Sequence, residues 1–364
     1  MRCEIDRGLF AELLAGVVNT LPSKTTYPVL QNALVAVNGG KLSLSGTDLD
    51  TFIRKDFTLE GPSEDGVVIV PGRKLAEVVR ESGGERVTIS SKEKNVVLES
   101  GNAKSVFAGL DPAEFPETPK LPEGVTFEFP LATLLELFDA TAFAVSKDES
   151  RPAMAGLNWE VSKTEARMVG TDGHRLACVG RKGKFGAKAK MIVGQKILGL
   201  FPRGEEKVSV FMDPAKVGFV FQNATIITRL IEGPYPDYER VIPKGYPGKA
   251  ILDHEEFAAA LRRAAVFAHP VGRLVALEFK KNKLRLAAET PELGRSEEEI
   301  GCEYGGEPLR IGFNAGYMLE ILRHIGSDKV VIELSNPLSA GLFKPAEPKP
   351  ESDDTFLLMP IRLD

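Results

Sequence analysis

The sequence predicts an α+β fold in which one unit occurs six times along the chain. Three features recur together about every 60 residues, namely an apolar strand-like opening, a one-sided helical segment and a hairpin. The openings of the six repeats lie near Cys3, Val68, Phe127, Met191, Ile251 and Ile311. Because one such repeat cannot bury its apolar face alone, we expect the copies to pack against one another around a continuous core.

The helical segment of each repeat carries its apolar residues on one side. These residues recur at spacings of three and four, which is typical of an amphipathic helix packed on a sheet. The clearest stripes are Leu75, Val78 and Val79 in the second repeat, Ile197, Leu198 and Phe201 in the fourth, Phe257, Leu261, Ala264 and Ala265 in the fifth, and Met318, Ile321, Leu322 and Ile325 in the sixth. Each helix is therefore expected to turn its polar face away from the sheets.

Two runs of alternating residues follow each helical segment, with a turn between them. In the first repeat Asn38, Gly39 and Gly40 separate the two runs, and in the fourth Asp213 and Pro214 separate them. Alternation on both sides of such a turn predicts an antiparallel hairpin.

The repeats also combine in pairs. Gly-Thr-Asp occurs at residues 46–48 and again at 170–172, and the looser Ala-Glu-Thr occupies 288–290. These positions lie in the first, third and fifth repeats, so the chain is predicted to form three domains of ordinary size, divided near Pro-rich links at 116–122 and 243–248. The predicted domains are residues 1–121, 122–246 and 247–364.

The composition is that of an ordinary folded protein. The chain is 43% hydrophobic and 27% charged, with a formal net charge of −5. No apolar run approaches the roughly 18 residues that a membrane helix needs, and the start of the chain lacks a signal peptide's apolar core, so we expect a cytoplasmic protein. Cys3, Cys178 and Cys302 are an odd number of cysteines without a CxxC pair, which predicts reduced structural thiols and no zinc site.

The sequence contains no familiar catalytic signature. Phosphate-loop, dinucleotide, zinc-protease and serine-hydrolase motifs are all absent, and the four histidines lack metal-ligand spacing. Asp172 and His174 form the one candidate acid-base pair. Thr47 and Asp48 occupy the same repeat position without a histidine, so the favoured interpretation of Thr-Asp is a turn in which the aspartate caps backbone amides. We therefore expect a binding protein without cofactor or metal, not an enzyme.

Four motifs carry a specific resemblance. They are Gly-Thr-Asp-Gly-His-Arg-Leu-Ala at 170–177, Tyr-Pro-Asp-Tyr at 235–238 with Arg240 and Val241, Phe313-Asn314 with Tyr317, and Leu-Met-Pro-Ile-Arg-Leu at 358–363. In this order and over the whole length, they resemble the DNA polymerase III beta subunits, the sliding clamps of bacteria. The resemblance implies a head-to-tail homodimer whose six clamp domains close into a ring around double-stranded DNA. It also implies a processivity factor whose partners are the polymerase III alpha subunit, the clamp loader and other proteins with a clamp-binding motif.

A protein that slides on DNA should contact phosphates with basic side chains and leave base edges unread. The polar faces of the copied helices supply the candidates. The predicted DNA-facing residues are Lys24, Arg73, Lys74, Arg80, Lys147, Arg151, Lys196, Arg203, Arg262, Arg263 and Arg323, with Arg7 as a further candidate. Lys24 stands where the resemblance implies an arginine, and Asp148 stands where it implies a DNA-facing glutamine.

The resemblance also implies a groove for partner peptides between the second and third domains. Its residues are Met154, Thr171, Gly173, His174, Arg175, Leu176, Pro236, Arg240, Val241, Asn314, Tyr317, Leu338, Met359, Pro360, Ile361 and Arg362. Flexible apolar side chains such as Met154 and Met359 can accept leucine or phenylalanine, and Arg175, Arg240 and Asn314 can bind a backbone or a carboxamide. Gly272 replaces an expected phenylalanine at the rim, and Asp364 follows the usual final leucine.

The dimer contact is expected to join the first domain of one subunit to the third domain of the other, which removes two unpaired sheet edges. Phe107, Val266 and Phe267 are its predicted apolar residues, and a core position is the alternative for Phe107 and Phe267. Two other functions stay open at this point. One is a repeat-built enzyme that uses Asp172 and His174, and the other is a monomeric repeat scaffold that binds proteins only.

Overall fold

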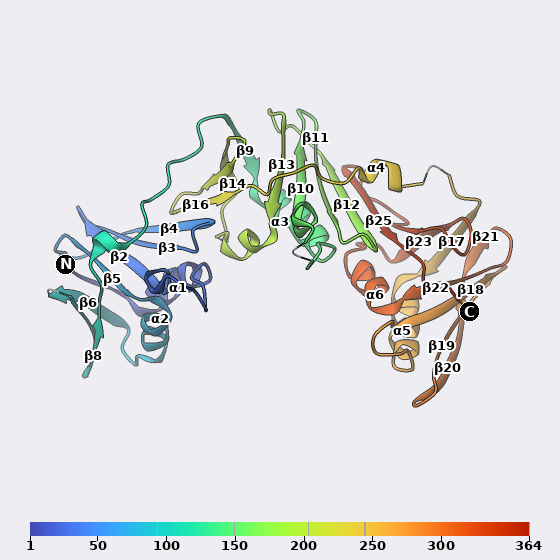
Figure 1. Cartoon of the computed structure of the whole chain (residues 1–364), viewed down its shortest axis with the longest axis horizontal. Helices are drawn as coiled ribbons and strands as arrows, with labels where there is room; N and C mark the ends of the chain where they lie inside the picture. Colours follow the sequence, from blue (N-terminus) through green and yellow to red (C-terminus); the bar gives the residue numbers. More distant parts are fainter. Residues whose placement is uncertain (93, 149, 203, 244, 364) are drawn as a thin grey trace. The chain divides into compact units, whose positions relative to one another are not determined.

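The computed structural model describes residues 1–92, 94–148, 150–202, 204–243 and 245–363 (Figure 1). Each of the six repeats begins with the predicted strand, helical segment and hairpin, and a third strand follows the hairpin in each of them, with the short β21 as a fourth in the fifth repeat. The first two repeats contain β1 (Arg2–Asp6), α1 (Arg7–Val18), η1 (Pro28–Gln31), β2 (Asn32–Asn38), β3 (Lys41–Thr47) and β4 (Thr51–Thr58), then β5 (Gly66–Pro71), α2 (Gly72–Glu81), β6 (Arg86–Lys92), β7 (Asn95–Ser100), β8 (Ala103–Ala108) and η2 (Pro112–Glu114).

The other four repeats follow the same order. The third and fourth contain β9 (Val125–Pro130), α3 (Leu131–Ala142), η3 (Pro152–Ala155), β10 (Gly156–Val161), β11 (Glu165–Thr171), β12 (Arg175–Lys182), β13 (Ala189–Gly194), η4 (Gln195–Leu200), β14 (Lys207–Met212), β15 (Lys216–Val220) and β16 (Ala224–Arg229). The short α4 (Tyr238–Val241) leads to the fifth and sixth, with β17 (Gly248–Asp253), α5 (His254–Ala265), β18 (Leu274–Lys280), β19 (Lys283–Thr290), β20 (Gly294–Gly301), β21 (Glu303–Gly305), β22 (Leu309–Asn314), α6 (Ala315–Arg323), β23 (Lys329–Leu334), β24 (Gly341–Pro345) and β25 (Ser352–Leu358).

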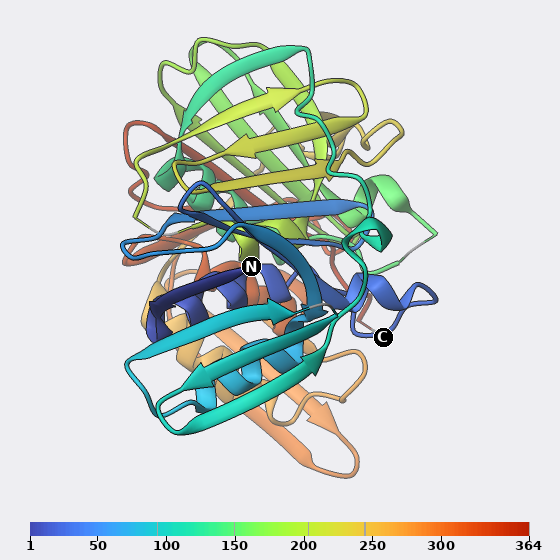
Figure 2. The ribbon, with the colours of Figure 1, turned by 90° about the vertical axis from the view of Figure 1, so that its left-hand side faces the viewer.

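The opening strand of each repeat pairs with the other repeat of its pair. β1 lies beside β6 to give the sheet β1-β6-β7-β8, and β5 lies beside β2. The same exchange places β9 on β14, β13 on β10, β17 on β23 and β22 on β18. Figure 2 shows β6, β7 and β8 running side by side in cyan. A single repeat therefore lacks one strand of its own sheet, which explains why the repeats occur in pairs.

The third strands of the repeats extend the sheets further. β4 pairs with β16 to give an eight-stranded sheet, and β12 pairs with β25 within a nine-stranded sheet. β8 and β20 are each an outer strand of a four-stranded sheet, with β1 and β22 at the opposite edges. The third strand is thus the position at which one pair of repeats joins the next.

The chain divides into two compact units. The first compact unit comprises residues 1–132 and 196–230, and the second comprises residues 133–195 and 231–364. Each contains one four-stranded sheet and one large sheet. This division passes through the middle of the predicted second domain, so the three domain boundaries stay a prediction.

The predicted apolar stripes lie in the core. Buried side chains include Leu75, Val79, Phe257, Leu261, Ala264, Met318, Ile321, Leu322 and Ile325. Val78, Leu198 and Ala265 are only half-buried. Full burial of one such large apolar side chain contributes about 1.5–3 kcal/mol, so these faces hold the helices on the sheets.

The fourth repeat departs from the prediction of an amphipathic α-helix. Its helical segment is a 3₁₀ helix of 6 residues, although Ile197 and Phe201 are buried as expected. Gly199 lowers the helix propensity of this short segment, and Pro202 disfavours a helical backbone at the residue before it. No helix among the described residues is both long enough and apolar enough to cross a bilayer.

Candidate functional site

The Thr-Asp motif of the third repeat forms a turn in the second compact unit. Thr171 Oγ1 donates to the Arg175 carbonyl at 2.7 Å and accepts from the Gly173 amide at 3.1 Å. Asp172 Oδ1 accepts from the amides of His174 and Arg175 at 2.9 and 3.0 Å. Gly173 has φ +88°, a backbone conformation that glycine adopts without strain.

The equivalent turn of the first repeat has the same bonds. Thr47 Oγ1 donates to the Thr51 carbonyl at 2.9 Å and accepts from the Leu49 amide at 3.0 Å. Asp48 Oδ1 accepts from the Thr51 amide at 2.7 Å. The prediction that Thr-Asp is a turn with a capping aspartate is therefore confirmed, and the aspartate of the candidate acid-base pair is committed to backbone amides and to Arg175.

Arg175, a predicted groove residue, is 8% exposed and joins β12 to α6. Its guanidinium donates to Asp172 at 3.1 Å, to the Phe143 carbonyl at 2.6 Å and to Glu320. The same group lies 4.2 Å from the ring centre of Tyr317. Arg175 uses these guanidinium donors on groups of the protein itself, so it helps to fix the shape of this site. Its contact with a partner peptide stays a prediction.

The segment after β25 lies against the start of β12. The Met359 amide donates to the His174 carbonyl at 2.8 Å, and the Ile361 amide donates to the Gly312 carbonyl at 2.8 Å. Met359, Ile361 and His174 are thus brought together by the backbone, although they are far apart in the sequence. The neighbouring Leu357 and Leu358 belong to β25, which lies between β12 and β24 in the nine-stranded sheet.

An apolar cluster lies beneath this segment. It consists of Val169, Leu176, Cys178, Tyr238, Ala340 and Leu357, with Tyr235 and Ile242 packed against it. The Tyr235 hydroxyl also donates to the Val169 carbonyl at 3.0 Å. The segment around Tyr235 and Tyr238, near the end of the predicted second domain, is therefore held on β11, β12 and β25 by these two tyrosines.

Three predicted groove residues expose apolar side chains. Val241 is 54% exposed, Leu338 is 62% exposed and Met359 is 42% exposed. Exposed large apolar residues that gather at one place mark interaction sites. The hydrogen bonds described above do not reach Val241 or Leu338, so their membership of one groove with Met359 stays a prediction.

Some of the remaining groove residues are exposed, and others are half-buried or hydrogen-bonded within the protein. His174, Pro236, Arg240 and Arg362 are exposed, Arg240 with an ion pair to Asp237 at 2.7 Å. Met154, Tyr317, Pro360 and Ile361 are half-buried. Asn314 caps α6 by accepting from the Tyr317 amide at 3.1 Å and donates to the Gly272 carbonyl at 3.1 Å, so both atoms of its amide are engaged.

Phe143 and Glu320 hold Arg175, and neither residue is among those predicted for the groove. The position of Glu320 on the polar side of the sixth helix could have indicated an acidic partner for a nearby arginine. Phe143 offers its backbone carbonyl and a ring 5.2 Å from the Arg175 guanidinium. Every residue has a backbone carbonyl, so this role of Phe143 could not be predicted from the sequence.

The predicted DNA-facing residues of the helices are exposed, and they differ in their partners. Ion pairs join Lys74 to Glu77 at 2.9 Å, Arg80 to Glu81 at 3.1 Å, Arg151 to Asp148 at 3.5 Å and Arg263 Nε to Glu298 at 2.7 Å. Within the described part of the chain, no ion pair is recorded for Lys24, Lys147, Lys196, Arg262 or Arg323. Arg73 donates to the Leu21 carbonyl, Arg7 donates to the Gly84 carbonyl, and Arg203 lies outside the described residues.

The three cysteines are buried and free, as predicted. Burial raises the pKa of Cys3 and of Cys302 to about 11 and that of Cys178 to about 12. These thiols therefore stay protonated and unreactive at neutral pH. In the ranges that the structure describes, no group of three or more His, Cys, Asp or Glu side chains could hold a metal ion.

Comparison with known proteins covers the chain from end to end. Family models of the DNA polymerase III beta subunit match its N-terminal domain at residues 1–119, its central domain at 128–237 and its C-terminal domain at 239–362. The beta sliding clamp of Pseudomonas putida is 31% identical over 97% of this chain and 96% of its own. That of Staphylococcus aureus is 30% identical over 100% of this chain and 99% of its own.

Solved structures agree over the whole length. A sliding clamp from Pseudomonas aeruginosa bound to griselimycin has a TM-score of 0.94 at 29% identity, with both chains fully covered. The beta subunit from Thermotoga maritima has a TM-score of 0.93 at 25% identity, again with full coverage of both chains. The three clamp domains predicted from the repeats are therefore present. The chain belongs to the family of DNA polymerase III beta subunits, the beta sliding clamps.

Proposed function

We propose that this protein is a DNA sliding clamp, a homodimeric ring that encircles double-stranded DNA and has no catalytic activity of its own. In this role it slides without reading sequence and tethers the replicative polymerase. Family membership supports the proposal, and the observation that carries it lies in the sheets. Of the six third strands, β4, β16, β12 and β25 pair with one another, whereas β8 and β20 are outer strands.

The two outer strands offer a way to close a ring. β4 pairs with β16, and β12 with β25, in antiparallel fashion. Antiparallel pairing of β8 in one subunit with β20 in another would repeat the same join. Two such joins make a head-to-tail dimer of six domains and leave neither edge free.

The residues predicted for the dimer interface are compatible with this closure. Phe107 is half-buried on β8, beside Val106, which is 59% exposed. Val266 is 68% exposed at the end of α5, and Phe267 after it is half-buried. α5 packs against β20, so these side chains lie near the outer strand that would receive β8.

Binding of DNA rests on the exposed basic residues of the helices. A ring needs only non-specific phosphate contacts, because topology and not affinity retains it. Arg262 has no ion pair among the described residues, so it is a better phosphate ligand than its neighbour Arg263, which Glu298 already neutralises. The acidic net charge is compatible with this role, because the sign of the local surface governs binding.

The exposed apolar residues beside β12 and β25 are proposed to receive the short peptides of the polymerase alpha subunit, the clamp loader and other clamp-binding proteins. Val241, Leu338 and Met359 would accept the apolar side chains of such a peptide. Its place is the junction of the predicted second and third domains. We place the protein in the cytoplasm as part of the same proposal.

The test combines mass with retention on DNA. The purified protein is sized by light scattering, loaded by its clamp loader onto nicked circular plasmid and re-isolated by gel filtration. We expect a dimer that stays on the circle at a salt concentration that releases ordinary phosphate contacts, and that leaves when a restriction enzyme cuts the circle. A monomer that never stays on the circle would contradict the ring and favour a scaffold that binds proteins only.

Four variants make this test specific. Phe107→Asp places a charge in the proposed interface and is expected to give monomers that are not retained. Val241→Asp changes a valine of the proposed groove, and is expected to keep the mass and the retention while losing the partner peptide. Arg262→Ala should slow loading more than Arg263→Ala, because only the first removes an uncompensated charge.

A further inference from the structure

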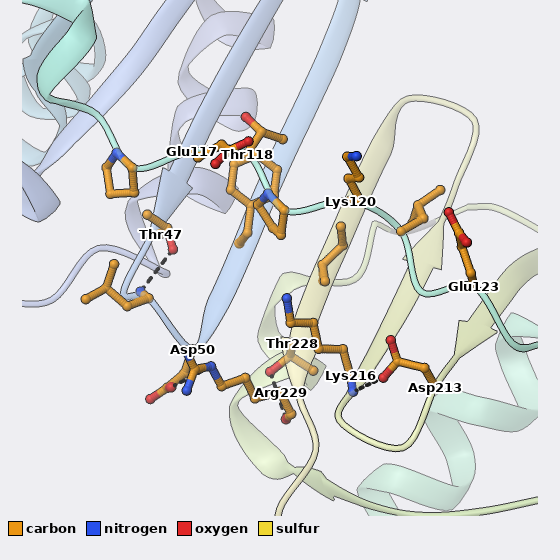
Figure 3. A pocket seen from close by; sticks show the side chains of 16 residues that line it. Thr47, Asp50, Glu117, Thr118, Lys120, Glu123, Asp213, Lys216, Thr228 and Arg229 are labelled. Carbon is orange, nitrogen blue, oxygen red and sulfur yellow. Dashed lines mark hydrogen bonds and ion pairs between the residues drawn. The ribbon is translucent and has the colours of Figure 1, made fainter.

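A cavity of about 640 Å³ lies within the first compact unit, at the junction of β4 and β16. Figure 3 shows the link with Glu117, Thr118 and Lys120 along one side, and the ends of the strands with Asp50 and Arg229 opposite. We call this cavity the junction slot. Its size is that of a site for a small ligand or a few residues of peptide.

The junction slot stands at a position equivalent to the apolar cluster of the second compact unit. Phe52 of β4 pairs with Ile227 of β16, and Leu176 of β12 pairs with Leu357 of β25. In both cases the first strand follows a Thr-Asp turn, and the second is the third strand of a later repeat. In both cases a segment near the end of a predicted domain lies at the pair, with residues 116–121 lining the junction slot and Tyr235 and Tyr238 at the apolar cluster.

The two segments differ in one residue at this position. Phe-Pro-Glu-Thr at 115–118 matches Tyr-Pro-Asp-Tyr at 235–238, so Phe115 corresponds to Tyr235 and Thr118 corresponds to Tyr238. Tyr238 belongs to the apolar cluster that contains Leu176 and Leu357, whereas Thr118 lines the junction slot with Phe52 and Ile227. The junction slot is therefore open at the place where Tyr238 closes the second compact unit.

Leu49 is a second side chain that distinguishes the junction slot from the equivalent place in the second compact unit. It lines the junction slot, is 49% exposed and has φ +79°. The equivalent residue in the second turn is Gly173, with φ +88°. A leucine in this conformation costs free energy that glycine would not, of the order of 1 kcal/mol, yet its side chain adds an apolar wall to the slot.

The link itself offers backbone groups to a ligand. Among the described residues, no backbone hydrogen bond is recorded for the amides of Glu117, Thr118, Lys120 or Leu121. Its far end is fixed, because Leu121 and Pro122 pack against β15, where a Cβ on Gly218 would lie 2.9 Å from Leu121 Cδ2. An extended segment with unused amides can pair with an extended peptide.

We propose that the junction slot is a second peptide site, which takes an extended segment carrying an aromatic side chain from a partner protein. The aromatic ring occupies the space that corresponds to Tyr238, against Leu49, Phe52, Leu121 and Ile227. The peptide backbone pairs with the link. This site goes beyond the proposed function and does not depend on the groove beside β12.

The probe is a synthetic peptide with the sequence of residues 232–242 of this chain, Glu-Gly-Pro-Tyr-Pro-Asp-Tyr-Glu-Arg-Val-Ile. Calorimetric titration of the full-length protein is expected to show saturable binding of one peptide per subunit. The peptide in which Tyr235→Ala and Tyr238→Ala are combined should bind about tenfold more weakly, because it lacks both rings. No saturable binding of the first peptide would overturn the proposal.

Protein variants then locate the site. Leu49→Gly should weaken binding about fivefold and leave the protein at least as stable, since glycine relieves the backbone while removing the wall. Leu293→Gly is the matched control, because Leu293 is also an exposed leucine in a turn, 55% exposed, and does not line the slot. Equal affinities of the wild type and Leu49→Gly would contradict the proposal.

A cross-linking experiment separates this site from the proposed groove. The same peptide carries p-benzoylphenylalanine in place of Tyr238, and the cross-linked residues are identified by mass spectrometry after irradiation. We expect cross-links to residues 47–52 and 116–123. Cross-links only to residues 236–241 and 359–362 would assign the peptide to the groove and overturn the junction slot, while leaving the proposed clamp function intact.

Discussion

The β4–β16 junction of the first compact unit and the β12–β25 junction of the second have the same backbone pairing and different side chains. At the first, Thr51 Oγ1 and Thr228 Oγ1 lie 3.0 Å apart in a neutral, buried pair. At the second, two arginines, Arg175 and Arg181, are buried and surrounded by carboxylates. The repeat thus determines which strands meet, and the side chains at the join determine how strongly charge contributes to it.

Removal of Arg181 is expected to have the largest effect. Arg181 Nη2 donates to Glu136 at 2.8 Å and to Asp354 at 3.3 Å. The hydrogen bond from Arg181 lowers the pKa of Glu136, whereas burial raises the pKa of Asp354. Arg181→Ala leaves a buried carboxylate without its partner, and such losses cost about 3–5 kcal/mol.

The measurement uses the one tryptophan of the chain, Trp159, which is fully buried in the second compact unit. Its fluorescence during urea unfolding should show a midpoint far below that of the wild type. Arg240→Ala is the control, because the Arg240–Asp237 pair is exposed and such pairs contribute little. A shift no larger than that of the control would show that the buried network does not stabilise this junction.

The hydroxyl pair of the first junction should have a smaller effect. Thr51→Val leaves the Thr228 hydroxyl with only a long 3.5 Å contact to the Arg229 carbonyl, and is expected to cost about 1 kcal/mol. Adding Thr228→Val should recover part of this loss, since both polar atoms are then gone. Circular dichroism of the unfolding transition checks this double-mutant cycle, and strictly additive losses would contradict coupling of the two hydroxyls.

The smallest expected effect is a dependence on pH that only the second compact unit should show, because all four histidines lie in it. His324 stacks on Phe143 with ring centres 4.7 Å apart, and burial lowers its pKa despite Asp139 nearby. Between the folded and unfolded pKa values the unfolded chain binds more protons. The stability that His324 contributes is therefore present above its unfolded pKa and is lost as the pH falls below about 6.5.

His324→Phe keeps the stacking and removes the titration. The fall of the Trp159 unfolding midpoint between pH 7.5 and 5.5 should then become shallower than in the wild type. An unchanged slope would assign the pH dependence to other groups. A control at the first junction is unnecessary, because that compact unit contains no histidine to titrate.

The sequence was most informative where a pattern is local. Helical stripes such as that of Met318, Ile321 and Leu322 report burial directly, because the period of a helix fixes which residues share a face. The turns at Thr47 and Thr171 could be identified because the same residues recur in equivalent repeats. These features gave the fold class and the three-domain arrangement.

Partners that depend on tertiary structure could not be read in this way. Alternation of apolar residues does not say that β1 pairs with β6 instead of β2. Arg175 looked like a peptide ligand, but its surroundings are set by Glu320 and by a carbonyl of Phe143. The junction slot is lined by residues from several separate segments, so no sequence motif predicts it.

The exchange of opening strands has a consequence during protein synthesis. When the first repeat leaves the ribosome, β2 lacks its neighbour β5, and β1 must wait for β6, so that Cys3 meets Ile89 only after both repeats have emerged. Contacts this far apart in sequence form slowly. The nascent chain therefore gains stable structure in steps of two repeats, and between these steps its half-made sheets are the surfaces that a chaperone would have to shield.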